Sequence, residues 1–177
     1  TGQEVTNEYR RAGEFSNGRA WIRKKGKYVI IDAEGTEYLN NTFTKLTPFM
    51  QNRATAVISG AKWVVIDKNA DIVGKNKYKR TKNFDSLGNC IVAKKRKWGL
   101  IDNNNNVIIP FKYQKIEGPV AGKYLLRKSR NRYSVYVFDT IENKPKKLGK
   151  VRNVSILTDG RIIAQKGSST YIIDGDN

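Results

Sequence analysis

Short apolar runs recur along the chain at a nearly constant interval, and each run ends at an aspartate. The aspartates are Asp32, Asp67, Asp102, Asp139 and Asp174, and they are separated by 35, 35, 37 and 35 residues. The runs are rich in β-branched and aromatic residues, which is typical of β-strands. A fixed interval of this length indicates tandem structural units, so the pattern predicts about five β repeats.

Each repeat is predicted to contain a hairpin and a weaker third strand. In the third repeat, residues 90–93 and 98–101 form the hairpin and residues 107–109 form the third strand. Pro110 should end that strand or confine it to a sheet edge. No stretch has the sustained period of an amphipathic helix. The predicted fold class is therefore all-β, with tandem hairpin/three-strand units of about 35 residues.

No linker or low-complexity segment divides the chain, so we predict one domain spanning residues 1–177. The repeats lie at about 14–47, 48–82, 83–117, 118–153 and 154–177. The last repeat stops before its third strand, and Tyr9 is in phase with Phe43. Residues 1–13 could therefore complete the last repeat. This favours a closed, propeller-like ring over an open β solenoid.

The third repeat contains the phrase Lys97-Trp98-Gly99-Leu100-Ile101-Asp102, followed by residues 106–113 with the sequence NVIIPFKY. This phrase resembles the WG-repeat (KWG-repeat) family of bacterial proteins. The other copies depart from it, and the second has Val64 where the family has glycine. The resemblance implies a repeat scaffold with an interaction role. It implies no general enzymatic activity and no particular partner.

The charge of the chain narrows the class of partner. Lys and Arg number 34 against 16 Asp and Glu, which gives a net charge of +18. Such a field attracts nucleic acids, anionic surfaces and acidic proteins. Basic residues gather at the predicted hairpin turns, which should form one rim of the repeat assembly. The candidate binding residues are Lys94, Lys95, Arg96, Lys97, Arg127, Lys128, Arg130 and Arg132. The alternative is a set of solvated turns that maintain solubility and protect sheet edges.

Other residue types give no sign of a catalytic centre. Trp21, Trp63 and Trp98 could form an aromatic platform, but packing between repeats is the favoured role. Cys90 is the only cysteine and there is no histidine, which excludes the usual Cys/His zinc sets within one chain. The repeated aspartates suit turn capping better than calcium binding. We therefore predict no catalytic residue, no metal and no cofactor.

The leading hypothesis is a non-enzymatic scaffold that binds a protein, a peptide or a polyanionic surface through the basic rim. A nucleic-acid-binding protein is the first alternative, and an enzyme with an unrecognised carboxylate site is the second. No apolar run reaches the length of about 20 residues that a membrane helix needs. A bacterial cell envelope or secreted location is favoured over the cytoplasm.

Overall fold

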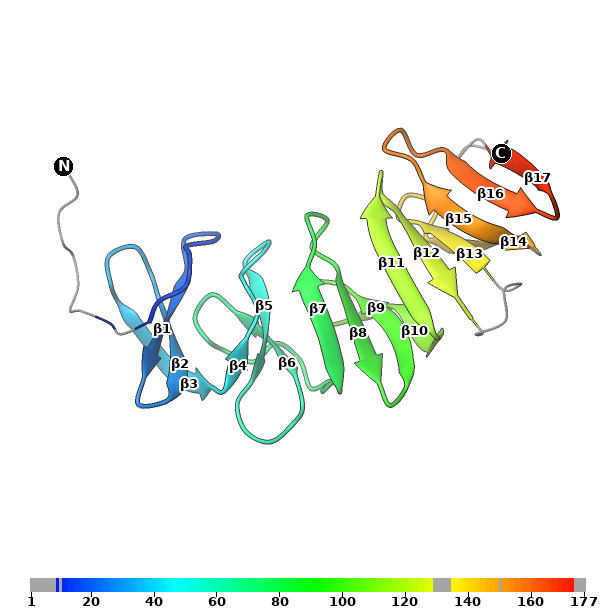
Figure 1. Cartoon of the computed structure of the whole chain (residues 1–177). Coiled ribbons are helices and arrows are strands. Elements are labelled where there is room, and N and C mark those ends of the chain that lie inside the picture. The colour runs from blue at the N-terminus through cyan, green and yellow to red at the C-terminus, as the bar shows by residue number, and fades with distance from the viewer. Residues whose placement is uncertain (1–8, 10, 129–134, 150, 174–177) are drawn as a thin grey trace, which may run out of the picture. The chain divides into compact units, whose positions relative to one another are not determined.

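The computed structural model describes residues 9, 11–128, 135–149 and 151–173 (Figure 1). These residues form seventeen strands in five sheets, and no helix occurs among them. Strands that neighbour each other in a sheet are also consecutive in the sequence, so each sheet is a simple antiparallel meander. The all-β prediction and the prediction of serial hairpins are confirmed.

The first sheet contains β1 (Ala20–Lys24), β2 (Lys27–Ile31) and β3 (Glu37–Phe43). A two-residue turn joins β1 to β2, and its residues Lys25 and Gly26 have φ angles of 49° and 80°. Positive φ at both positions is the mark of a type I′ turn, whose twist suits paired strands. The predicted first hairpin is therefore present with a tight, basic turn.

Residues upstream of β1 extend the first sheet at its outer edge. The Arg23 amide donates a hydrogen bond of 2.9 Å to the Arg11 carbonyl, so these residues face each other across the strands. The turn between the two segments contains Asn17 and Gly18, with φ angles of 54° and 70°. Asn-Gly is a strong local signal for a two-residue hairpin turn. The sequence therefore encodes this pairing, although the repeat period alone does not predict it.

The second sheet contains β4 (Lys45–Leu46), β5 (Arg53–Val57) and β6 (Val64–Asp67), and isolated bridges place residues 72–78 beside β6. The third sheet contains β7 (Arg80–Phe84), β8 (Cys90–Lys94), β9 (Lys97–Ile101) and β10 (Val107–Tyr113). β10 is an edge strand of this sheet, and Pro110 lies within it. Proline has no amide proton to donate to a neighbouring strand, so the edge is where it is tolerated.

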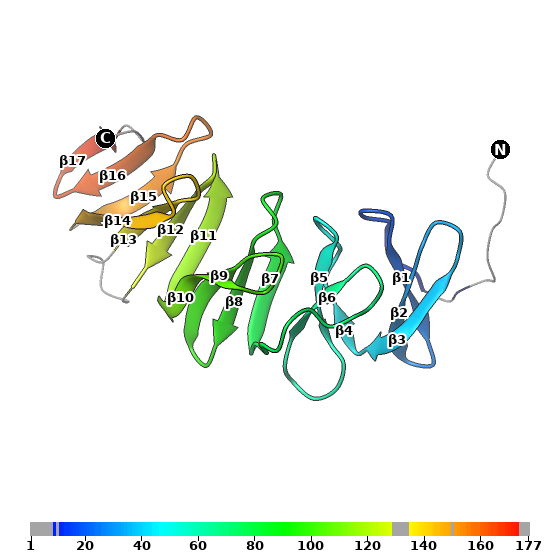
Figure 2. The same ribbon diagram turned by 180° about the vertical axis from the view of Figure 1, so that it is seen from behind.

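The fourth sheet contains β11 (Lys115–Val120), β12 (Lys123–Arg127), β13 (Val135–Asp139) and β14 (Lys144–Gly149). The fifth sheet contains β15 (Arg152–Ile156), β16 (Ile162–Lys166) and β17 (Ser169–Ile173), and β17 is its edge strand. Figure 2 shows the same sheets from behind. Asp174 and the other residues after 173 lie outside the described part of the chain.

Four sheets have a strand before the hairpin that the sequence did not predict. In the second to fifth sheets, β4, β7, β11 and β15 pair with the first strand of the hairpin. β7 has the sequence RTKNF, and only Phe84 is buried in it. Because an exposed edge strand has little apolar alternation, it leaves no clear period in the sequence.

The repeated aspartates cap the turns that follow their strands. The Oδ1 atom of Asp67 accepts hydrogen bonds of 2.9 and 3.0 Å from the amides of Asn69 and Asp71. Asp102 accepts equivalent bonds of 2.9 and 2.7 Å from the amides of Asn104 and Asn106. The predicted capping role is confirmed at these positions. Carboxylates that accept hydrogen bonds from backbone amides in this way have a structural role in the turn.

The chain divides into two compact units, which comprise Thr1–Lys95 with Leu100–Ile109, and Arg96–Gly99 with Pro110–Asn177. Each unit contains an apolar core between consecutive sheets. In the first unit, one cluster joins two sheets through Ile30, Phe43, Phe49, Ala54, Ala56, Val64, Ile66 and Ala70. In the second unit, another cluster contains Leu125, Val135, Val137, Val151, Val154, Ile162 and Ala164. Burial of these side chains between sheets provides the main stabilisation of each repeat.

Candidate binding surface

The predicted basic residues at 94–97 lie at the turn between β8 and β9. Lys95 and Arg96 are exposed there. Lys94 is half-buried, and its Nζ atom donates a hydrogen bond of 2.8 Å to Asn76 Oδ1. The same Nζ lies 5.6 Å from the ring centroid of Tyr78, within cation–π range. Lys94 is therefore part of the packing, and the exposed charge of this turn comes from its neighbours.

The other predicted basic residues lie in the second unit. Arg127 ends β12, and its Nε atom lies 3.4 Å from Glu117 Oε2, so its charge is partly balanced. Lys128 follows it and is exposed. Arg130 and Arg132 lie outside the described residues. The described side chains of the predicted rim therefore differ in their surroundings. Lys94 and Arg127 have polar or acidic partners, whereas Lys95, Arg96 and Lys128 are exposed.

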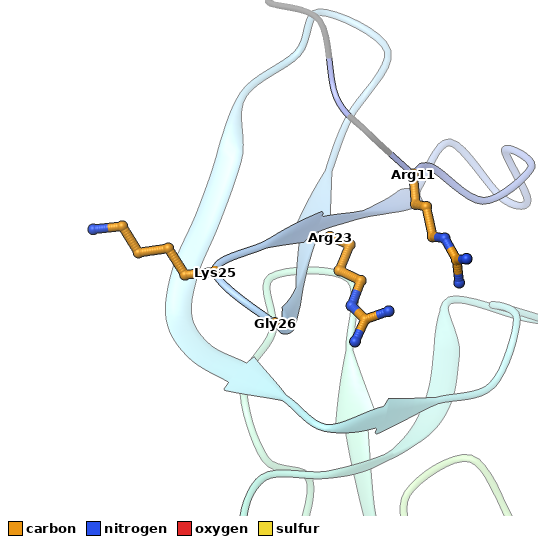
Figure 3. Close-up of a pocket in the computed structure, with 4 residues that line it drawn as sticks. All are labelled: Arg11, Arg23, Lys25 and Gly26. Atoms are coloured by element: carbon orange, nitrogen blue, oxygen red, sulfur yellow. The ribbon is translucent and has the colours of Figure 1, made fainter.

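A basic site that was not predicted from the sequence lies on the first sheet. Arg11 and Arg23, which face each other on paired strands, extend their guanidinium groups to the same side, while the Lys25 side chain points away (Figure 3). These residues and Gly26 line a depression of about 550 Å³. We call Arg11 and Arg23 together the arginine pair.

The arginine pair has no counter-charge in the described part of the chain. Neither guanidinium group takes part in an ion pair with a described carboxylate. Like charges directly opposite each other on antiparallel strands repel and disfavour the pairing. Two adjacent guanidinium groups are suited to bind a carboxylate or phosphate, which would remove that repulsion.

Glu37 of the first sheet binds side chains other than the arginine pair. Glu37 pairs with Lys24, with 2.7 Å between Nζ and Oε2, and it also accepts a hydrogen bond of 3.2 Å from the Tyr9 hydroxyl. The hydrogen bond with Glu37 raises the pKa of Lys24. Successive residues of a strand point to opposite faces, so Lys24 and Arg23 are separated by the sheet. Glu37 thus neutralises one face and leaves the other basic.

Two further arginines have a structural role. Arg19 Nε donates a hydrogen bond of 2.8 Å to the Lys68 carbonyl, and Arg53 Nε donates one of 2.7 Å to the Asn103 carbonyl. Each arginine lies at the start of a hairpin and reaches the aspartate turn of the following sheet. The two bonds are equivalent in the repeat, and they tie consecutive sheets together. Arginines of this kind are therefore not available to a partner without loss of a repeat contact.

The tryptophans lie among neighbouring side chains and are half-buried. The Trp21 ring packs edge-on against Tyr28, with centroids 4.8 Å apart. It also lies so close to Gly13 that a Cβ atom there would come within 2.2 Å of Trp21 Nε1. Trp63 forms a β-bridge with Tyr78, and Trp98 is in β9. The contacts of Trp21 agree with the packing role that was expected for the tryptophans.

Cys90 is fully buried in β8, as the sequence predicted. Burial raises the pKa of its thiol to about 12. The reactive form of cysteine is the thiolate, which is scarcely populated at neutral pH with such a pKa. Among the described residues, no group of three or more His, Cys, Asp or Glu is placed to hold a metal ion.

A family model described as "WG containing repeat" matches residues 1–28 and 98–130. The two matched segments together cover about a third of the chain. The second match covers the Trp98-Gly99 pair in β9 and continues through β10 and β11 into the next sheet. The WG-repeat phrase thus corresponds to the strand before the aspartate turn and the strands that follow it. The resemblance inferred from the sequence is confirmed.

The solved structures that resemble this chain have low sequence identity to it. One described as a eukaryotic initiation factor has a TM-score of 0.52 and 10% identity, over 96% of this chain and 53% of that chain. Hsv2 of Kluyveromyces lactis has a TM-score of 0.49 and 12% identity, over 90% and 57%. A WD40 β propeller domain of Doa1 has a TM-score of 0.37 and 12% identity, over 83% and 57%.

This chain spans little more than half the length of these structures. At such identities the likeness concerns the fold alone. A comparison with curated proteins gives no significant match. No helix in the described residues is long and apolar enough to cross a membrane.

Proposed function

We propose that this chain is a non-enzymatic binding module that holds an acidic segment of a partner protein at the arginine pair. The observation that carries this proposal is the placement of Arg11 and Arg23 opposite each other without a described carboxylate partner. A carboxylate-rich segment would supply the missing counter-charges and could form bidentate bonds with the guanidinium groups.

The distribution of acidic side chains supports an external counter-charge. The chain has 34 Lys and Arg against 16 Asp and Glu. Several of the aspartates cap turns, as Asp67 and Asp102 do, so their carboxylates are occupied by backbone amides. For the same reason we do not propose an enzyme with a carboxylate site.

Titration with a fluorescent polyglutamate peptide tests this proposal. The double variant Arg11→Gln/Arg23→Gln should weaken binding about tenfold or more, because each lost charged hydrogen bond is worth about 1.5–3 kcal/mol. Lys144→Gln/Lys147→Gln is the matched control, since it removes the same charge from exposed positions in β14. Equal loss in the two variants would show attraction by net charge alone and would contradict a specific site.

The nucleic-acid alternative is separated by the same titration with duplex DNA. Binding to phosphates should weaken by about 0.9 log units per log unit of salt for each phosphate contacted. If DNA bound more tightly than polyglutamate at physiological salt and the arginine-pair variant lost that binding, the partner would be a nucleic acid. If neither probe bound, the proposed function would be wrong.

Closure of the repeats into a propeller-like ring stays a prediction of the sequence. It requires residues 1–13 to complete the last sheet beside β17. The prediction assumes that Tyr9 and Phe43 are equivalent positions of the repeat. Their packing supports this, because Tyr9 packs against the core of the first sheet and Phe43 belongs to the core that includes the second sheet. Deletion of residues 1–13 should then lower the melting temperature sharply, and an unchanged melting temperature would contradict the ring.

A further inference from the structure

A second depression lies beside the arginine pair, within the first unit. Its volume is about 380 Å³, which is within the range of roughly 300–1,000 Å³ that ligand pockets have. Its apolar walls come from the segment before β1, from β1 and from the loop between β4 and β5, and they are Phe15, Trp21, Pro48 and Phe49. Phe15 is 54% exposed, and Pro48 is exposed as well. We call this depression the apolar pocket.

The apolar pocket and the arginine pair lie on the same face of the first sheet. Arg11 lies opposite Arg23 on the paired strands. Two residues further along, Gly13 lies opposite Trp21. Alternate residues of a strand point to the same face, so the Trp21 indole is on the face of the arginine pair. Gly13 leaves room for the indole there, since it has no Cβ atom to meet Trp21 Nε1.

A β-bulge accounts for the position of Phe15 at the wall of the apolar pocket. Gly13 pairs with Trp21, but Ser16 pairs with Arg19, so the first strand has one residue more than β1 between these pairs. Such an extra residue is a β-bulge, and bulges redirect side chains and are frequent beside functional sites. Phe15 lies in this bulge and lines the pocket with more than half of its surface exposed.

The walls of the apolar pocket are held by hydrogen bonds within the fold. The Ser16 hydroxyl donates a hydrogen bond to the Phe49 carbonyl, which joins two sides of the pocket. A pocket that is held in this way loses little conformational freedom when a ligand binds. Glu14 and Arg19 also line the pocket, and their opposite charges favour neither sign of ligand charge. An uncharged, apolar side chain is therefore the ligand that suits it.

Extending the proposed function, on which this inference rests, we propose that the acidic segment of the partner has an aromatic side chain that fills the apolar pocket. At about 3.3 Å per residue of strand, Arg23 is roughly 7 Å from the level of Trp21 and roughly 13 Å from that of Arg19. An extended ligand covers these distances in about two to four residues. Aromatic rings pack favourably against one another, and Phe15 and Trp21 offer two. The partner is therefore an acidic segment with an aromatic residue about two to four positions from its carboxylates.

Fluorescence titration with matched peptides tests this inference. One peptide has a run of glutamates, a Gly-Ser spacer and a phenylalanine, and its control has serine in place of phenylalanine. Both are made in the two chain directions. The phenylalanine peptide should bind about tenfold more tightly than its control in at least one direction, because an aromatic side chain becomes buried.

The outcomes of this titration separate the inference from the proposed function. Equal affinity of the two peptides in both directions would overturn the aromatic anchor, while binding of an acidic peptide at the arginine pair would still stand. Absence of binding by both peptides would overturn the proposed function and the anchor together.

A single substitution in the wall of the apolar pocket locates the anchor. Phe15→Ser should remove most of the gain from phenylalanine and leave the affinity for the serine peptide unchanged. Leu39→Ser is the matched control, because Leu39 is 61% exposed in β3 of the same sheet and is not among the described residues that line either depression. A gain that survives Phe15→Ser, or that Leu39→Ser removes equally, would show that the aromatic side chain binds elsewhere.

The indole N–H signals in nuclear magnetic resonance spectra give an independent readout. The phenylalanine peptide should shift the signal of Trp21 more than the serine peptide does, because Trp21 lines the apolar pocket. A larger shift at Trp63 or Trp98 than at Trp21 would contradict the proposed location.

Residues 1–8 of the chain itself are the competing occupant. They include Glu4, Val5 and Glu8, which combine carboxylates with an apolar side chain, but they include no aromatic residue. The full-length variant Glu4→Gln/Val5→Ser/Glu8→Gln removes this chemistry and should bind the phenylalanine peptide as the unmodified chain does. A clear gain in affinity would show that the chain's own segment competes for the site, and it would overturn an external partner.

Discussion

The first and last sheets contain the same hairpin but differ in what covers it. In the first sheet β3 pairs with β2, and Ile30 packs in a core shared with the second sheet. In the last sheet β17 is an edge, and Ile172 is 61% exposed. The sequence motif therefore specifies the hairpin and its aspartate turn. The burial of the motif's central residue depends on the strand and the sheet that come next.

The largest expected effect contrasts these two equivalent isoleucines. Ile30→Ala removes a fully buried side chain and should lower the free energy of unfolding by about 2–5 kcal/mol. Ile172→Ala should change it by less than about 0.5 kcal/mol in the monomer, because an exposed side chain has little packing to lose. Urea unfolding at low protein concentration measures both.

A large loss in Ile172→Ala at the lowest concentration would mean that Ile172 is buried within a single chain. That outcome would favour closure of the repeats into a ring.

The second prediction concerns the outer edge of the first sheet, which residues 11–13 cover. Gly13→Ala should destabilise the chain by about 1–3 kcal/mol, because the new Cβ would lie 2.2 Å from Trp21 Nε1 and the indole would have to move. The tryptophan fluorescence emission should shift as well, because the indole would have moved. Ser155→Ala is the control, because it replaces an exposed residue of β15 and should leave the stability unchanged.

If Gly13→Ala melted like the unmodified chain, the packing of residues 11–13 against β1 would be wrong, and the geometry of the arginine pair would lose its support. The prediction thus tests the site as well as the edge.

The period of the repeat made the hairpins and aspartate turns predictable, since both depend on residues close in sequence. Non-local features were harder to predict. Arg11 and Arg23 come together only when the Asn17-Gly18 turn is recognised and its register is assigned. The hydrogen bond from Arg53 to the Asn103 carbonyl joins two sheets, and no local sequence pattern predicts it.

A count of charges treats all basic residues of a turn alike, although their surroundings differ. Lys94 is held by Asn76 and Tyr78, which precede it by a whole strand, so its engagement could not be predicted from its own segment. The strand β7 was missed for a related reason. β7 has a polar sequence because it lies at the edge of its sheet. That position is known only when the order of the strands in the sheet is known.

The smallest predicted effect compares an aspartate of the first sheet with one of the last. Asp32 is largely buried, which raises its pKa, but hydrogen bonds from the Thr36 amide and the Tyr38 hydroxyl outweigh this and leave the pKa below its usual value. Asp159 is about half exposed, and its pKa is lowered by a hydrogen bond from Arg161. Both carboxylates therefore favour the folded state when ionised.

A carboxyl whose pKa is lower in the folded state contributes stability above its unfolded pKa, which is about 3.9 for aspartate. That contribution is lost as the pH falls through the lower, folded pKa. Asp32→Asn should therefore melt below the unmodified chain at neutral pH, and the difference should shrink on acidification below about pH 4. Asp159→Asn should follow the same direction with a smaller change, because its contacts are local and open to solvent. Melting curves from pH 7 to pH 2 measure both, and a larger effect at Asp159 would contradict the view that the repeat is held more firmly where a following strand covers it.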